Sequence, residues 1–174
     1  TNQALLANMS VAWYMYHGRD NVKEIANDIY EKTLYLKNSI RGNMLNNTFF
    51  DTLSFSSDIY NQNDLNKLEE DGISVFKNPM KNYISITIDE THTYDDIDIL
   101  IDYLNPTNYF SLIYKFKGPD PLPKPLRDSD YCHQDIFNNY NQEQTLARYL
   151  TKLQKKDYSL LDGMIPLGSC TMKY

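Results

Sequence analysis

The sequence predicts an α+β fold in which helices cover a small antiparallel sheet. Apolar residues recur at helical spacing in residues 3–16 and 21–36. They alternate with polar residues in two short stretches, 49–55 and 84–88. Turn residues separate these stretches, so the expected order over the first 105 residues is α-α-β-α-β-β-α.

Two helices are expected first. The first carries an apolar stripe, and Gly18 is expected to end it. Asn21 and Glu24 have the spacing of a capping box, which predicts that a second helix starts at Asn21. The first stripe consists of Leu5, Met9, Ala12, Trp13 and Tyr16, and the second of Val22, Ile25, Ala26, Ile29, Thr33 and Leu36.

The period then changes to two. Residues 49–55 have the chemistry of a strand, with Phe49, Asp51, Leu53 and Phe55 on one side. A polar helix is expected from about 58 to 70. Its apolar residues are Ile59, Leu65 and Leu68, and Gly72 closes it.

A hairpin is expected next. Residues 73–76 are the first strand, residues 77–82 with Pro79 are the loop, and residues 84–88 are a strand with one buried face. Thr93 and Asp96 are then placed to cap a last helix. The apolar residues of that helix are Ile97, Leu100, Ile101 and Leu104.

The character of the sequence changes after Asn105. Four prolines predict a stiff extended arm, namely Pro119, Pro121, Pro123 and Pro125. A helix is expected near 142–155, with Leu146, Leu150 and Leu153 on its apolar face. The tail from 162 to 174 is irregular and apolar, and no charged-then-apolar leader opens the sequence at Thr1. Either the start was processed away or the chain is a piece of a longer polypeptide, and in the second case an exposed apolar patch is expected where the missing domains would dock.

Composition excludes some classes of function. Lys and Arg number 17 and Asp and Glu 23, a net charge of −6, which disfavours nucleic acid as a partner. No apolar run approaches the roughly 20 residues of a membrane helix, so no membrane partner is expected. Two cysteines cannot build a disulfide framework, so reduced thiols in an intracellular compartment are expected.

Metal and nucleophile sites are weakly indicated. One acidic cluster contains a histidine, and Cys132-His133 forms a second cluster, but neither has the paired spacing of a zinc site. The acidic cluster comprises Asp89, Glu90, His92, Asp95 and Asp96. Such carboxylates are expected at a helix start without an ion, so no metal is predicted. No local signature ties a base to Ser169, Cys170 or Thr171, and a structural role is expected for His17 beside Gly18.

The tail carries the most specific signal. Residues 164–173, MIPLGSCTMK, resemble the signature of glycine dehydrogenase (decarboxylating), the P-protein of the glycine cleavage system. Residues 3–9 (QALLANM), 16–18 (YHG), 49–52 (FFDT), 88–91 (IDET) and 148–150 (RYL) resemble segments of the same family in the same order.

This resemblance implies the small C-terminal domain of a type I, aminotransferase-like, pyridoxal-phosphate-dependent fold, with flanking helices and the proline-rich arm. Residues 1–40 would be helices from the end of a large domain, and 41–104 the small α+β domain. Residues 105–135 would be a linker, and 136–174 a helix and the signature loop that start a second half.

The implied activity is decarboxylation of glycine with pyridoxal phosphate and transfer of the aminomethyl group to the lipoylated H-protein. The active-site approach would be lined by Gly168, Ser169, Cys170, Thr171 and Lys173. The family's Schiff-base lysine lies beyond the signature. Lys173 is not expected to replace it, because a Schiff-base lysine must be desolvated in a closed pocket. No catalytic residue is therefore assigned.

Two departures favour an alternative. Gln134 and Asn141 stand where the family has histidines, so two groups that titrate near neutrality are lost. The chain is then either a segment that acts with the remainder of a P-protein or a partner subunit, or a silent relict that binds P-protein or H-protein. By family, the compartment would be mitochondrial in a eukaryote and cytoplasmic in a bacterium.

Overall fold

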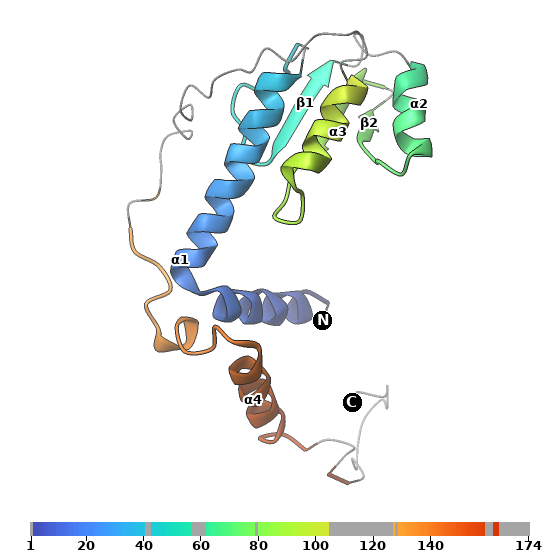
Figure 1. Cartoon of the computed structure of the whole chain (residues 1–174). Helices are drawn as coiled ribbons and strands as arrows, with labels where there is room; N and C mark the ends of the chain where they lie inside the picture. The colour runs from blue at the N-terminus through green and yellow to red at the C-terminus, as the bar shows by residue number, and fades with distance from the viewer. Residues whose placement is uncertain are drawn as a thin grey trace. The chain divides into compact units, whose positions relative to one another are not determined.

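The computed structural model describes residues 2–40, 43–56, 62–78, 80–104, 127, 129–158 and 162–163. The chain divides into two compact units, drawn in Figure 1. Unit 1 consists of Thr1–Lys23 with Ser129–Tyr174, and unit 2 of Glu24–Asp128. The predicted proline-rich arm and the signature tail lie outside the described residues. The domain boundaries predicted at 40, 104 and 135 stay predictions.

Helix α1 (Asn2–Ser39) is broken once, at Gly18. Gly18 has φ 74° and ψ 167°, a conformation that side chains other than glycine disfavour. The predicted end of the first helix at Gly18 is thus confirmed. The predicted start of a second helix at Asn21 is wrong, because Gly18 alone is non-helical inside α1. The Asn21 side-chain amide instead lies 3.3 Å from His17 Nδ1.

The sheet of unit 2 has the antiparallel order β1-β3-β2. Its strands are β1 (Thr52–Ser56), β2 (Phe76–Asn78) and β3 (Tyr83–Thr87). Strand β1 pairs with β3 so that Leu53 faces Ile86 and Phe55 faces Ile84, and all four side chains are buried. On the other face, hydroxyl groups pair across the same strands. The predicted α+β fold with an antiparallel hairpin is confirmed.

Strand β2 is displaced from its predicted position at 73–76. Gly72 and Ile73 instead close helix α2 (Gln62–Glu70): the Gly72 N–H donates to Glu69 O and the Ile73 N–H to Leu68 O, at 3.1 and 2.8 Å. This is a Schellman arrangement, with Gly72 at φ 84°. Since it holds Ile73 at the helix end, the strand begins only at Phe76. The predicted residue Ile59 lies outside the described residues.

Helix α3 (Tyr94–Leu104) begins as predicted. The Asp96 N–H donates to Thr93 Oγ1 at 3.2 Å, and the Thr93 N–H donates to Asp96 Oδ2 at 2.8 Å. These reciprocal bonds satisfy two backbone donors that the first turn would leave open. Tyr35 of α1 also donates to Asp98 Oδ1 of α3 at 2.5 Å, which ties the two helices together.

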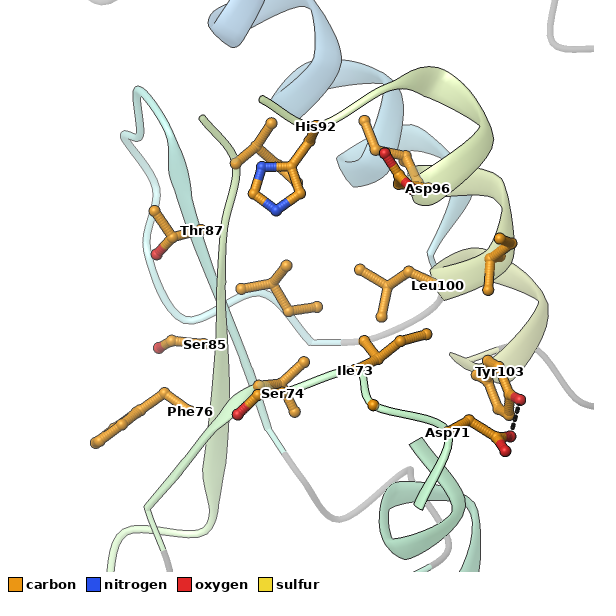
Figure 2. Close-up of a pocket in the computed structure, with 16 residues that line it drawn as sticks. Asp71, Ile73, Ser74, Phe76, Ser85, Thr87, His92, Asp96, Leu100 and Tyr103 are labelled. Carbon is orange, nitrogen blue, oxygen red and sulfur yellow. Dashed lines mark hydrogen bonds between the residues drawn. The ribbon is translucent and has the colours of Figure 1, made fainter. Parts of the chain in front are cut away.

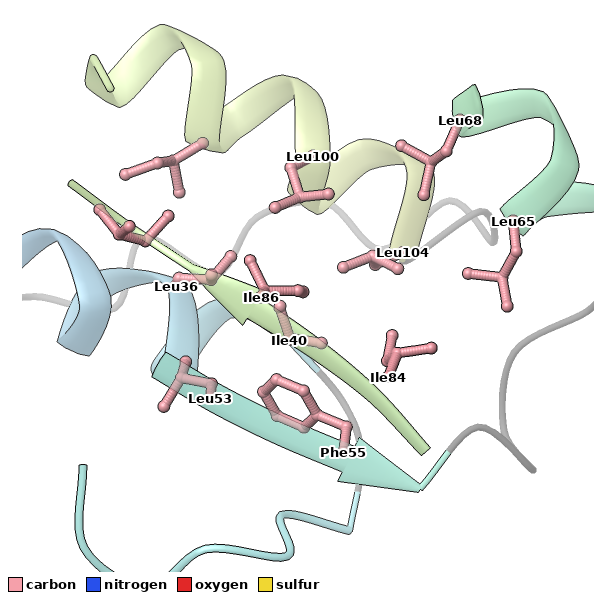
Figure 3. Packing of buried hydrophobic residues seen from close by; sticks show 12 residues of the cluster. Leu36, Ile40, Leu53, Phe55, Leu65, Leu68, Ile84, Ile86, Leu100 and Leu104 are labelled. Carbon is pink, nitrogen blue, oxygen red and sulfur yellow. The ribbon is translucent and has the colours of Figure 1, made fainter. Parts of the chain in front are cut away.

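The core of unit 2 lies between the sheet and the helices, as Figure 3 shows. Strands β1 and β3 contribute one apolar face, and α2, α3 and the end of α1 cover it. Burial of each such side chain contributes about 1.5–3 kcal/mol. The members are Leu36, Ile40, Leu53, Phe55, Leu65, Leu68, Ile84, Ile86, Ile88, Ile97, Leu100 and Leu104.

Unit 1 contains the first half of α1, a short 3₁₀ helix η2 (Asp135–Phe137) and helix α4 (Glu143–Gln154). Met15 is the only buried apolar side chain among its described residues. Part of the predicted apolar face of α4 is uncovered: Leu146 is half-buried, but Leu150 is 46% and Leu153 40% exposed. Leu5, Leu6 and Met9 of α1 are 63%, 61% and 58% exposed. Exposed apolar side chains are thus present on both helices, and the predicted docking patch stays a prediction.

Candidate functional site

Two sequence segments singled out above meet at Gly18, within unit 1. Gly18 is buried, and a Cβ atom there would stand 2.6 Å from Asn141 Nδ2 and 3.3 Å from the Phe137 carbonyl oxygen. The backbone angle therefore favours glycine, and the space is tight, because an added Cβ atom would have to displace the end of the Asn141 side chain. We call the contact of Gly18 with Phe137 and Asn141 the Gly18 junction.

Polar contacts fasten a neighbouring segment to the same part of α1. Arg19 Nη1 donates to Asp130 Oδ1 at 3.0 Å. The Tyr131 hydroxyl donates to the Arg19 carbonyl oxygen, also at 3.0 Å. The ion pair is partly exposed, so its contribution to stability is about 1 kcal/mol or less.

His17 has packing and hydrogen-bonding partners on its own helix. Its ring lies 4.4 Å from the Trp13 ring and 5.2 Å from the Tyr16 ring, measured between centroids. Together with the Asn21 amide, these neighbours hold the imidazole along α1. This placement agrees with the structural role expected for His17.

The candidate metal clusters have other partners. His133 Nδ1 lies 3.8 Å from Asp130 Oδ2, and the neighbouring Cys132 has φ 51°. Asp89 Oδ1 accepts the Thr91 N–H and hydroxyl, at 2.9 and 2.6 Å, and these bonds lower the pKa of Asp89. Among the residues that the structure describes, no group of three or more His, Cys, Asp or Glu side chains is arranged to hold a metal.

A hollow of about 630 Å³ opens in unit 2, and Figure 2 shows it from close by. One wall is β3 and the residues after it, the opposite wall is residues 71–76, and α3 forms the third. Ile73 and Leu100 supply apolar surface between the walls. Its size and mixed lining are typical of ligand sites.

Each end of the hollow carries a polar pair. His92 Nδ1 accepts the Asp89 N–H at 3.1 Å and lies 2.7 Å from Asp89 Oδ1. At the other end the Tyr103 hydroxyl donates to Asp71, and this hydrogen bond raises the pKa of Tyr103 (Figure 2).

The one buried lysine among the described residues does not fit the Schiff-base role of a pyridoxal phosphate site. Lys32 is the buried lysine of unit 2, but its Nζ lies 2.6 Å from Asp28 Oδ2 and 6.0 Å from the centre of the Tyr94 ring. A Schiff base needs a neutral amine free to attack a carbonyl, whereas Lys32 is held in an ion pair. The predicted lining residues Gly168, Ser169, Cys170, Thr171 and Lys173 lie outside the described residues.

Comparisons with known proteins agree with the resemblance of the motifs. Residues 1–104 match the family model described as glycine cleavage system P-protein. The chain is 39% identical to glycine dehydrogenase (decarboxylating) of Deinococcus radiodurans over 177 residues. The chain belongs to the glycine cleavage system P-protein family. It is also 37% identical to the mitochondrial P-protein of Dictyostelium discoideum and 33% identical to that of Homo sapiens.

Each of these alignments covers 99% of this chain but only 18% of the relative. The chain thus spans about a fifth of the length of the P-proteins it matches. The relatives come from bacteria and from mitochondria. Within the described part of the chain, no helix is long and apolar enough to cross a membrane.

Sequence reasoning missed both the Gly18 junction and the hollow. Their residues are far apart along the chain, and neither apolar periodicity nor a local motif reports such distant contacts. One signal was readable in each case. A glycine such as Gly18, in the YHG segment, often marks a close neighbour or a positive φ angle. Gly72 just after α2 indicated that the next residues close that helix.

Proposed function

We propose that this chain is part of a P-protein that decarboxylates glycine, and that it is inactive by itself. The observation that carries the proposal is the alignment of 99% of the chain with 18% of each of two relatives named glycine dehydrogenase (decarboxylating). In this proposal pyridoxal phosphate would be held by the remainder of the P-protein, and it would supply the electron sink for loss of carbon dioxide there. The aminomethyl group passes to the lipoylated H-protein.

The chain would contribute structure rather than the cofactor amine. Unit 2 supplies the small domain of a type I fold, with predicted bounds at residues 41–104. Residues 105–135 link it to the segment 136–174, whose loop from Gly168 to Lys173 lines the approach to the active site. The Schiff-base lysine comes from the remainder of the P-protein or from a partner subunit.

Unit 1 supports this proposal physically. Leu5, Leu6 and Met9 of α1 expose most of their surface. Leu150 and Leu153 of α4 expose a large part of theirs. Exposed apolar faces on two helices of one unit are typical of a surface that another polypeptide covers. In the proposed assembly the remainder of the P-protein buries them.

Two assays on the purified chain test the proposal. With pyridoxal phosphate and borohydride, mass spectrometry should find no reduced pyridoxal adduct on any specific lysine. Glycine-dependent exchange of labelled carbon dioxide should be absent from the chain alone, and should appear when the remainder of a P-protein is added. A specific adduct at Lys173, or exchange by the chain alone, contradicts the proposal.

A second candidate is a catalytically silent copy that only binds P-protein or H-protein. Gln134 and Asn141, where the resembling family has histidines, favour it, and the Asn141 side chain lies against Gly18. The two candidates differ in one result. The silent copy associates with the remainder of the P-protein without restoring exchange.

A further inference from the structure

The hollow of unit 2 is a split between two strands. Strand β3 pairs with β1 from Tyr83 to Thr87, but β2 pairs with β3 only from Phe76↔Ser85 to Asn78↔Tyr83. Continued in the same register, residue 74 would face Thr87. Instead the bond from the Ile73 N–H to α2 draws residues 73–75 away from β3. The edge of β3 beyond Ser85 is therefore open toward the hollow.

The open edge presents backbone groups. The Ile88 N–H donates to Asp51 O, on the β1 side of the sheet, at 2.9 Å. Successive residues of an antiparallel strand direct their backbone groups to opposite sides, so those of Thr87 face the split. Among the described loops and turns, no backbone hydrogen bond reaches Thr87. An unpaired strand edge is a template for another strand.

The walls of the split restrict what can enter. Ile73, Val75, Ile99 and Leu100 line it with apolar surface, which suits the side chains of an extended segment. Its acidic lining residues are Asp71 and Asp96, and none of the sixteen described lining residues is Lys or Arg. Coulomb attraction therefore favours a segment with cationic flanks over one with anionic flanks.

We propose that the split takes an extended apolar segment with a basic flank, which adds to β3 at Thr87, and that this segment belongs to the part of the P-protein polypeptide outside these residues. The assignment of this segment to the P-protein polypeptide rests on the proposed function above. Relatives are about five times as long as this chain, so most of their polypeptide is available to cover the split. Strand addition uses backbone bonds for affinity and side-chain pockets for specificity.

Probe peptides test the site on the chain itself. The sequence Lys-Val-Ile-Val-Ile-Lys, blocked at both ends, should slow exchange of the Thr87 amide at least about tenfold by NMR. The same peptide with Glu flanks should bind more weakly, and one with proline in its centre should not bind. Equal binding of the three peptides, or no slowing at Thr87, overturns the site.

Two exposed residues give matched variants. Ile99→Glu places a charge in the split and should abolish binding of the Lys-flanked peptide. Met80→Glu, at a side chain that is 95% exposed and outside the split, should leave binding unchanged. If Thr87 is already protected in the chain alone, or becomes protected as the chain self-associates, another occupant fills the split and the proposal fails.

The source is tested separately with the Deinococcus radiodurans P-protein lacking its matching region. A complex in which the Thr87 amide is protected supports the source. A complex without that protection overturns it and leaves the proposed function standing. No complex at all overturns the source and contradicts the proposed function, while the peptide titration still decides whether the site exists.

Discussion

Units 1 and 2 differ in how they bury apolar residues. Unit 2 packs twelve buried side chains between three helices and a sheet. Unit 1 buries Met15 alone among its described apolar residues and leaves apolar faces of α1 and α4 exposed. Both units have amphipathic helices, so helix formation is not the difference. A unit becomes independent only when its apolar faces have a partner within the chain.

The largest expected loss of stability comes from a substitution in the core of unit 2. Phe55→Ala removes a 2%-exposed ring from unit 2 and should lower the free energy of unfolding by about 3–5 kcal/mol, measured with urea. Leu150→Ala, the matched change in unit 1, should cost about 1 kcal/mol or less, because that side chain is 46% exposed. Equal costs would contradict the contrast between the units.

The next effect falls on the Gly18 junction. Gly18→Ala adds a Cβ atom 2.6 Å from Asn141 Nδ2 at a positive φ, so unit 1 should lose about 1–3 kcal/mol of local stability. Hydrogen exchange of residues 129–141 measures this. Gly72→Ala is the control for strain alone, since nothing lies within 4 Å of its Cβ position.

A double variant separates the two causes at the junction. Combining Gly18→Ala with Asn141→Ala removes the closest contact and should recover part of the loss. If Gly18→Ala and Gly72→Ala have the same effect, and Asn141→Ala recovers nothing, close packing at Gly18 is not important.

A smaller effect concerns the bond between α1 and α3. Tyr35→Phe removes the hydrogen bond to Asp98 and should cost unit 2 about 1 kcal/mol at neutral pH. That bond, together with burial and the negative charge of Asp98, raises the pKa of Tyr35 from 10.0 to about 12. A raised folded-state pKa gives stability that is present below pH 10.0 and lost as the pH rises toward about 12. Urea unfolding across this range should therefore show wild type and variant converging; a constant difference contradicts the assignment.

The smallest expected effect concerns the ion pair between Arg19 and Asp130 in unit 1. Arg19→Ala breaks the ion pair with Asp130 in unit 1 and should change the free energy of unfolding by about 1 kcal/mol or less. Added salt should reduce the difference between wild type and Arg19→Ala. Hydrogen exchange in residues 129–131 is the measurement. A large, salt-independent loss would mean that this pair, rather than the Gly18 junction, holds the segment.

Local signals predicted much of the fold. The reciprocal Thr93 and Asp96 bonds, the break at Gly18 and the alternation in β3 are short-range features, and all three are confirmed. In the first strand the alternation holds for Leu53 and Phe55, but β1 begins at Thr52 and not at the predicted Phe49. The errors at Asn21 and at β2 arose where two local preferences competed. The helix continues directly after Gly18, so Asn21 lies inside it and starts nothing. Ile73 takes part in the end of α2 next to Gly72, so it cannot start a strand.

The candidate sites were less predictable. The signature residues from Gly168 to Lys173 identified the family but lie outside the described structure. The Gly18 junction joins residues more than a hundred positions apart, and the split beside Thr87 exists because one strand ends early. Such features depend on tertiary contacts, which apolar periodicity does not report.

Hydrogen exchange of this chain, alone and with the remainder of a P-protein, tests the central claim most directly. Alone, the core of unit 2 should be protected while residues 2–17 and 143–154 of unit 1 exchange rapidly. With the remainder added, those unit 1 residues should become protected. Full protection of unit 1 in the isolated chain, with no change on addition, would contradict the claim that another part of the P-protein covers it.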